Sequence, residues 1–251
     1  MNAFVDPPRL PTIDLSLFDI GDPWRDHVAA QIDWAASTFG VFQIVGHGVD
    51  PGLIDTLLEL GGKYLSRPPR GAGERSDLPG FHDTVREYTT TLTGLGHKLM
   101  AAIARGLRLD DGFFVDRYTG NPSTALRIRD YPVVLPGSEP PDLDEMSERG
   151  LLTLVKLGES ERQQVGFAGG WIEVPALPGA LLCYVGPLLE RLTHGHYIAA
   201  PHRLSVGSAS DRPSLSFDFQ PGLAAVLTPL VAMRPRLETA GHGDYARAAL
   251  C

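Results

Sequence analysis

The clearest indication of how this chain folds is a short apolar run enclosed by glycines, Phe39-Gly40-Val41-Phe42-Gln43-Ile44-Val45-Gly46-His47-Gly48-Val49. Its β-branched and aromatic centre predicts a strand over residues 41–45. Upstream, apolar residues recur at helical spacing from Val28 to Phe39, and Gly40 is a typical helix terminator. We expect that helix to begin with an Asp22 cap and Pro23, so the run marks the passage from a helix into a strand.

Further helices are expected on the C-terminal side of this run. Asp50 and Pro51 predict the start of a helix with an apolar face at Ile54 and Leu57. Residues 66–80 are rich in proline, glycine and charge, which favours a loop. A long amphipathic helix is predicted over residues 82–107, and a short helix is expected near residues 111–118.

Beyond about residue 121 the pattern changes to short strands separated by turn signals. The expected strands cover residues 124–130, 151–157, 164–167, 171–174, 180–185, 203–208 and 214–220. Many short strands at this spacing are typical of a sandwich or barrel, and a last helix is predicted over residues 243–250. We therefore predict one α+β domain over residues 1–251, with a helix-rich region over 1–120 and a β core with a C-terminal helix over 121–251.

Composition excludes several classes of protein. The 251 residues are 43% hydrophobic, and 22 Lys and Arg against 30 Asp and Glu give a net charge of −8. No basic surface for nucleic acid or anionic membrane is indicated. Two cysteines, Cys183 and Cys251, do not make a disulfide scaffold. No apolar stretch reaches the roughly 18 residues of a membrane span and no secretion signal is visible, so a soluble, cytoplasmic protein is expected.

Histidines are the first candidates for chemistry. His194, His196 and His202 lie close together in the sequence, and imidazoles with a nearby carboxylate are typical metal ligands. The alternative is that one or two of them are solvent-facing loop residues. His47, between two glycines after a strand, is interpreted as a turn or capping residue.

A second candidate is the sequence Arg212-Pro213-Ser214 at the start of the last predicted strand. Residues two apart on a strand share one face, so Arg212 and Ser214 together fit a carboxylate. The alternative is a turn arginine followed by an ordinary strand serine. Glycine-rich phosphate loops and a Gly-x-Ser-x-Gly elbow are both absent from the sequence, which gives a nucleotide fold or a serine hydrolase no support.

Taken in order, these segments resemble the isopenicillin-N-synthase-like 2-oxoglutarate/Fe(II)-dependent oxygenases. The similar segments are residues 11–15, 39–49, 150–154, 170–174, 178–181, 201–204, 212–214 and 240–245. The resemblance implies a double-stranded β-helix, or jelly-roll, core with flanking N-terminal helices. It also implies an oxidoreductase that acts on a small molecule with Fe(II) and 2-oxoglutarate as cofactors.

The resemblance assigns roles to individual residues. Iron in this family is held by two histidines and one carboxylate, which leaves positions open for the keto acid and oxygen. His202 matches the distal histidine. Arg212 and Ser214 match the pair that holds the far carboxylate of 2-oxoglutarate, and Tyr131 matches a tyrosine that helps to cradle it.

The chain departs from the family pattern at the other metal ligands. The proximal His-x-Asp falls on Met146-Ser147-Glu148. Glu148 has a longer arm but is still able to bind iron, whereas the Met146 thioether prefers soft ions. Arg129 replaces the asparagine that precedes Tyr131 by two positions. His202 and Glu148 are therefore the metal-ligand candidates, in a degenerate motif.

Three hypotheses follow from these departures. The first is an oxidoreductase of the family with an altered metal site. The second is a non-catalytic relative, a binding or scaffold module that keeps a carboxylate-binding pocket and in which Arg129 pairs with Glu148. The third is a metal-free isomerase or cyclase that uses Glu148, Tyr131 or His202 as acid or base. The sequence assigns no catalytic residue and no particular substrate.

Overall fold

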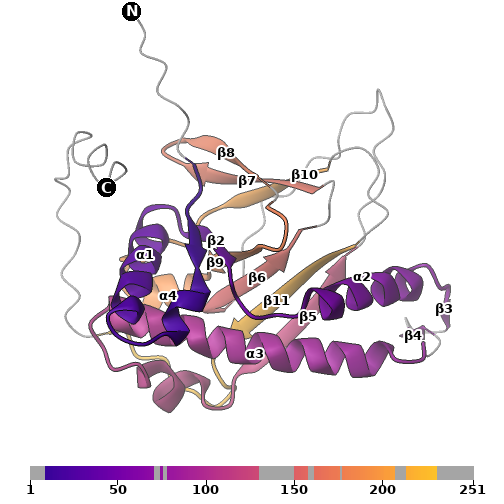
Figure 1. Cartoon of the computed structure of the whole chain (residues 1–251), viewed down its shortest axis with the longest axis horizontal. Coiled ribbons are helices and arrows are strands. Elements are labelled where there is room, and N and C mark those ends of the chain that lie inside the picture. The colour runs from indigo at the N-terminus through magenta and orange to yellow at the C-terminus, as the bar shows by residue number, and fades with distance from the viewer. Residues whose placement is uncertain are drawn as a thin grey trace, which may run out of the picture.

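The structure is a computed structural model that describes residues 9–70, 74–75, 78–129, 150–157, 161–175, 177–206 and 213–230. Two β-sheets face each other, and the long helices lie along the outer side of the larger sheet (Figure 1). This is the α+β jelly-roll arrangement that the sequence predicts. The helix expected over residues 243–250 lies outside the described residues, and the single-domain division stays a prediction.

The helices follow their sequence signals closely. They are α1 (Trp24–Thr38), α2 (Pro51–Leu65), α3 (Phe81–Gly106) and α4 (Pro187–Leu192), with a 3₁₀ turn at Leu15–Asp19 and a π-helical turn at Val115–Thr119. Asp50 caps α2 by accepting a hydrogen bond from Gly52 N. The prediction that Asp22 caps α1 is wrong, because the cap position is Pro23 and the Asp22 carboxylate instead binds Arg105. The sequence analysis missed α4, since six residues are too few to show helical periodicity.

Six strands form the large sheet. In spatial order they are β1 (Thr12–Asp14), β2 (Val41–Val45), β9 (Leu181–Val185), β6 (Leu152–Lys156), β11 (Ser214–Gln220) and β5 (Ser123–Arg129). β2, the strand predicted from the opening run, pairs with β9 from the second half of the chain. The helix-rich region and the β core therefore share one sheet.

A smaller sheet of three strands covers one face of the large one (Figure 1). Its spatial order is β10 (His202–Val206), β7 (Glu161–Phe167) and β8 (Gly170–Val174). Within the segment predicted as a loop, β3 (Pro69–Arg70) and β4 (Glu74–Arg75) form a short antiparallel pair. Every strand expected after residue 121 is present; β11 has the predicted ends, and the ends of the others differ by at most three residues.

The outer face of the large sheet forms an apolar core with the helices. Leu215, Phe217 and Phe219 alternate along β11 toward this side, and each is buried. At Gly96 the helix α3 comes so close that an added Cβ would lie 2.5 Å from the Phe219 ring. The glycine, a poor helix former, is therefore explained by close packing.

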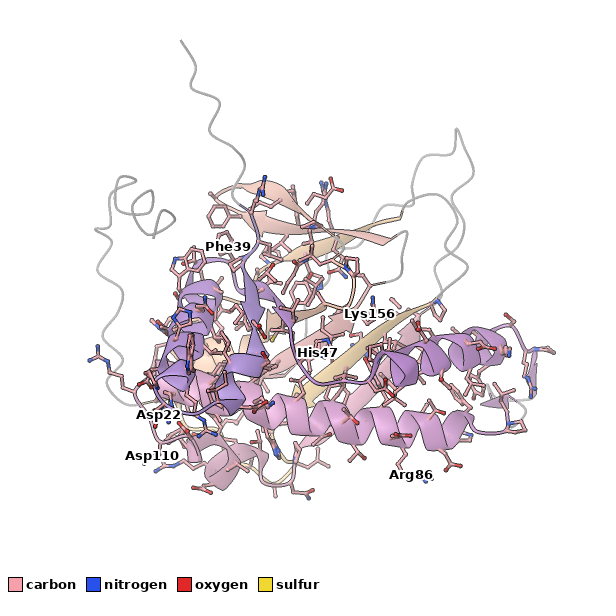
Figure 2. The ribbon with its side chains drawn as sticks, viewed as in Figure 1. Asp22, Phe39, His47, Arg86, Asp110 and Lys156 are labelled. Carbon is pink, nitrogen blue, oxygen red and sulfur yellow. The ribbon has the colours of Figure 1, made fainter. Side chains whose placement is uncertain are left out.

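A second, smaller core lies between the two sheets. Val41, Val155, Leu182 and Val165 belong to it. Phe39, at the end of α1, stacks on Phe167 of β7 with ring centroids 4.8 Å apart, and it lies where α1 meets the small sheet (Figure 2). Buried polar side chains, among them Gln163, His202 and Asp218, also face the space between the sheets.

No helix in the described ranges combines the length and apolar character needed to span a bilayer. Cys183 is a free thiol in β9 with no exposed surface, as its apolar surroundings in the sequence predict. Burial raises the pKa of this thiol far above its usual value, so the side chain stays protonated and unreactive at neutral pH.

Candidate functional site

The inner face of β11 differs from its outer face in being polar. Ser214, Ser216 and Asp218 point toward the small sheet and have exposed fractions of 5%, 7% and 0%. In register, Asp218 pairs with Thr153 of β6, which in turn pairs with Tyr184 of β9. A row of polar side chains thus crosses the inner face of the large sheet.

His202 begins β10 and is 1% exposed. Its register partner is Val165 of β7, which belongs to the core between the sheets. The ring Nδ1 lies 3.4 Å from the carbonyl oxygen of Ala200. A proton on Nδ1 leaves Nε2 with its lone pair, which is the form of imidazole that binds a metal.

Tyr184 fixes the position of His202 from the opposite sheet. The two rings are 4.3 Å apart at an angle of 30°. The Tyr184 hydroxyl donates a hydrogen bond to Gln163 Oε1 of β7, and both side chains are buried. The sequence analysis did not single out either residue. The available signal was a tyrosine in an otherwise apolar strand, because a buried tyrosine hydroxyl usually has a polar partner.

Arg127 and Asp218 form an ion pair on the same inner face. The Arg127 guanidinium donates to both carboxylate oxygens of Asp218, and the Thr153 hydroxyl donates to Oδ1 at 3.2 Å. The sequence analysis missed this pair as well. The signal was a charged residue, Asp218, on the polar side of the alternating strand 214–220, where the other polar residues are uncharged.

Of the predicted 2-oxoglutarate contacts, the structure describes Ser214. This residue is buried on the inner face of β11, and its register partner is Arg129 of β5. Arg212, Tyr131 and the metal-ligand candidate Glu148 lie outside the described residues. Their roles, and the pairing of Arg129 with Glu148, therefore stay predictions.

The structure does not gather the three clustered histidines into one group. His196 Nε2 lies 3.0 Å from Asp33 of α1, and that carboxylate also accepts a hydrogen bond of 2.9 Å from Tyr197. His194 is exposed. Among the described residues, no group of three or more His, Cys, Asp or Glu side chains is placed to hold a metal ion. Of the three, only His202 faces the space between the sheets.

His47 links the loop after β2 to the loop before β9. Its Nδ1 accepts a hydrogen bond from Val49 N at 3.1 Å, so Nε2 carries the proton and donates to Gly179 O at 2.9 Å. Burial lowers the pKa of His47; the Gly179 carbonyl opposes this effect and Lys156 adds to it. The interpretation of His47 as a turn residue agrees with this geometry.

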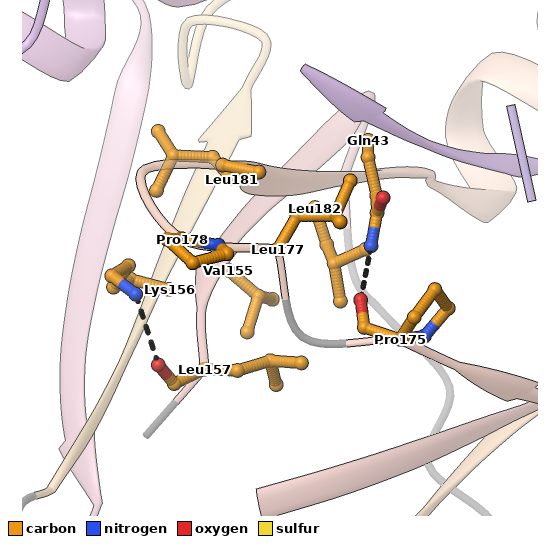
Figure 3. A pocket seen from close by; sticks show the side chains of 10 residues that line it. Gln43, Val155, Lys156, Leu157, Pro175, Leu177, Pro178, Leu181 and Leu182 are labelled. Atoms are coloured by element: carbon orange, nitrogen blue, oxygen red, sulfur yellow. Dashed lines mark hydrogen bonds between the residues drawn. The ribbon is translucent and has the colours of Figure 1, made fainter. Parts of the chain in front are cut away.

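A pocket of about 200 Å³ lies at the C-terminal end of β6, where Lys156, labelled in Figure 2, and Leu157 contribute to its lining. Its walls are mainly aliphatic, and Gln43 is held there by donating to Pro175 O (Figure 3). Lys156 Nζ donates to Leu157 O at 3.3 Å. Neither His202 nor Ser214 lines this pocket, whose lining includes Val155 and Leu182 of the core between the sheets.

Comparison with known proteins matches both parts of the chain. Residues 10–91 match the family described as non-haem dioxygenase in morphine synthesis N-terminal, and residues 122–221 match the 2OG-Fe(II) oxygenase superfamily. A probable iron/ascorbate oxidoreductase of Dictyostelium discoideum is 27% identical, over 88% of this chain and 84% of that protein.

Solved structures share the fold. A full-length Neurospora crassa protein in complex with alpha-KG has a TM-score of 0.80 at 19% identity, covering 100% of this chain and 99% of that one. JOX2, in complex with 2OG, Fe and JA, has a TM-score of 0.75 at 23% identity, covering 94% and 82%.

Two facing sheets with helices on the outer side of the larger one are the fold that this chain shares with these solved 2-oxoglutarate-binding proteins. The chain belongs to the 2OG-Fe(II) oxygenase superfamily. Membership implies Fe(II) and 2-oxoglutarate as cofactors, in agreement with the expectation from the sequence.

The described residues fit these cofactors in part. Buried His202 suits one iron ligand, and buried Ser214 suits a hydrogen bond to a carboxylate. The family pattern places the other iron ligands at Met146 and Glu148, which lie outside the described residues. A glutamate oxygen suits Fe(II), whereas a thioether does not.

Proposed function

We propose that the protein is a 2-oxoglutarate/Fe(II) oxygenase-type oxidoreductase that acts on a small molecule through an altered metal site. His202 and Glu148 would hold the iron, with Met146 at the position of the third ligand. Arg212, Ser214 and Tyr131 would hold 2-oxoglutarate. The observation that carries the proposal is the buried His202 facing a polar inner sheet surface that includes Ser214.

In this proposal each of these residues has a separate role in binding iron or 2-oxoglutarate. His202 offers Nε2 while Nδ1 faces Ala200 O, and Tyr184 restrains the ring. The Ser214 hydroxyl would donate to the far carboxylate of the keto acid, beside the bidentate Arg212. Iron, when bound, would supply the activation of oxygen needed for hydroxylation, desaturation or cyclisation. The walls between the sheets would exclude bulk water from that chemistry.

Relatives support a small-molecule substrate. They include 1-aminocyclopropane-1-carboxylate oxidase of Dictyostelium mucoroides and a dioxygenase for auxin oxidation of Arabidopsis thaliana. The Neurospora crassa protein has also been solved with thymine. These compounds are all small, which favours a small molecule here. A cytoplasmic location stays a prediction from the sequence.

The thioether at position 146 favours a second candidate function. A chain that lacks one of the two histidine ligands holds Fe(II) less tightly, because imidazole suits iron and a thioether does not. In that case the protein is a non-catalytic or metal-free relative that keeps the carboxylate pocket, as a binding module or as an isomerase or cyclase. Arg212 and Ser214 would still bind a small carboxylate.

An anaerobic titration of the metal-free protein with Fe(II) and then 2-oxoglutarate separates the two candidates. The oxygenase proposal expects a visible charge-transfer band, produced when the keto acid chelates bound iron. That band should disappear in His202→Ala. The matched control is His196→Ala, which removes a histidine that pairs with Asp33 instead of facing the sheets.

The same titration also shows what would contradict the proposal. Absence of iron binding and of the band in the unaltered protein favours the non-catalytic or metal-free relative. A band that survives in His202→Ala means that iron binds elsewhere, and it removes His202 from the site. Loss of the band in Glu148→Gln, with folding unchanged, would support Glu148 as the carboxylate ligand.

A further inference from the structure

Asp218 is a fully buried acidic side chain on the inner face of β11. It lies between Phe217 and Phe219 on a central strand, and its exposed fraction is 0%. Taking a carboxylate out of water is costly unless it is paired and hydrogen-bonded. Departures of this kind from local rules are expected mainly at functional sites.

The contacts of Asp218 hold one arginine in a fixed orientation. Arg127 Nη1 donates a hydrogen bond to Asp218 Oδ1 at 3.3 Å, and Arg127 Nη2 donates one to Asp218 Oδ2. The Thr153 hydroxyl donates to Oδ1 from the opposite neighbouring strand at 3.2 Å. Two bonds from the planar guanidinium fix its direction as well as its position.

The two partners differ in accessibility. The Asp218 side chain is 0% exposed, whereas that of Arg127 is 34% exposed. A molecule that enters from solvent therefore meets the guanidinium and not the carboxylate. The exposed third of the Arg127 side chain is therefore accessible to a ligand while Asp218 holds the guanidinium in place.

The charges of the described residues on the inner faces of β5 and β11 are carried by Arg127, Arg129 and Asp218. Arg129 has an interaction of its own, so Arg127, held by Asp218, is the cation that these strands present to a ligand. A guanidinium has five N–H donors, and those that Asp218 does not use suit an anionic group.

Arg127 lies at a different level of the sheet from the predicted 2-oxoglutarate contacts. It pairs with Ser216, whereas Ser214 pairs with Arg129. Two residues along a strand correspond to about 6.6 Å. This distance is enough for two separate anionic groups, one at each level.

We propose that Arg127, oriented by Asp218 and Thr153, binds an anionic group of the small-molecule substrate, most simply a carboxylate. Arg127 is the residue that contacts the substrate, and Asp218 and Thr153 are positioning residues. This inference rests on the proposed function for the identity of the substrate. It adds a second anion site that is distinct from the one formed by Arg212 and Ser214.

The test measures binding of small carboxylates and of their neutral amides to the full chain by calorimetry. The probes are benzoate, phenylacetate and hexanoate, each with the corresponding amide. At least one carboxylate should bind with an affinity about tenfold or more above that of its amide, as expected for a charge-assisted bond. Arg127→Gln should remove this preference, and Arg127→Lys should recover part of it.

Arg212→Gln is the matched control, because it removes the other predicted anion site. Arg212→Gln should abolish 2-oxoglutarate binding and leave the carboxylate probe bound. Arg127→Gln should abolish binding of the probe and leave 2-oxoglutarate bound. Asp218→Asn should weaken probe binding with less effect on 2-oxoglutarate. If Arg127→Gln does not fold because the buried Asp218 loses its cation, the double variant Arg127→Gln/Asp218→Asn, which removes both charges, takes its place.

Three outcomes overturn the inference: equal affinity for carboxylates and amides, binding of none of the probes, or a probe that is lost in Arg212→Gln and kept in Arg127→Gln. None of these depends on iron. If the protein binds no iron and shows no charge-transfer band, but Arg127 still selects carboxylates over amides, only the proposed function is contradicted. Arg127 would then be the anion site of a binding protein.

Discussion

The two faces of β11 belong to one strand but differ in the polarity of their side chains. On the outer face, Leu215, Phe217 and Phe219 pack into an apolar core against the helices. On the inner face, Ser216 and Asp218 bring polar groups into a space that is also shielded from solvent. The outer face supplies stability through burial of apolar area. The inner face places groups that are costly to bury, which indicates binding or chemistry.

The largest expected effect comes from breaking the outer face. Phe217→Ala removes a fully buried ring and leaves a cavity, which should lower the free energy of unfolding by about 3–5 kcal/mol. Leu223→Ala is the control, because Leu223 is 98% exposed and its loss should change stability by about 0.5 kcal/mol or less. Urea unfolding measures both, and equal effects would contradict the assignment of Phe217 to the core.

A smaller effect is expected for the inner ion pair. Asp218→Asn keeps the size of the side chain but loses the charged partner of Arg127, which is one-third exposed and able to regain water. We expect a loss of about 1–3 kcal/mol in the free energy of unfolding. A loss as large as that of Phe217→Ala would mean that the pair stabilises the fold more than it prepares a site.

The hydrogen bond between Tyr184 and Gln163 should contribute still less to the free energy of unfolding. Tyr184→Phe keeps the ring on His202 but leaves Gln163 Oε1 without that donor, at a cost of about 1–2 kcal/mol. The double variant Tyr184→Phe/Gln163→Leu should regain part of this loss, since both partners are then apolar. If Gln163→Leu adds its full cost to that of Tyr184→Phe, the two side chains are not coupled.

The smallest effect concerns pH. Because the folded pKa of His47 lies below 6.5, the unfolded chain binds more protons between the two pKa values. The stabilisation from neutral His47 is therefore present above pH 6.5 and lost as pH falls through the folded pKa. His47→Gln should flatten this part of the melting temperature profile, with His27→Gln as a control. Parallel profiles for the two variants would exclude this contribution.

Sequence pattern was sufficient for most of the fold. The spacing of Val28, Ile32 and Phe39 predicted α1, and the turn signals between short strands predicted β11 over residues 214–220, as observed. The cap of α1 was wrong because Asp22 has a better partner in Arg105, a residue far away in sequence. Periodicity carries no information about such distant charge pairs.

Candidate site residues came from the sequence where they formed a local motif or matched the family pattern. His202 and Ser214 were found in this way, and both lie on inner strand positions. Tyr184, Gln163 and Asp218 escaped notice, because a polar side chain in an apolar strand gives no indication of its partner. Their roles depend on which strands become neighbours.

By itself, the sequence determined the elements, the alternation of each strand and the family, since all of these are local or motif-based properties. Only the tertiary structure decided which polar residues meet. Antiparallel register places Asp218 beside Thr153 and within reach of Arg127, and the packing of one sheet on the other brings Tyr184 against His202. The physical reason is that burying a polar group costs free energy unless it forms a hydrogen bond, and strand order determines which hydrogen-bond partner lies within reach.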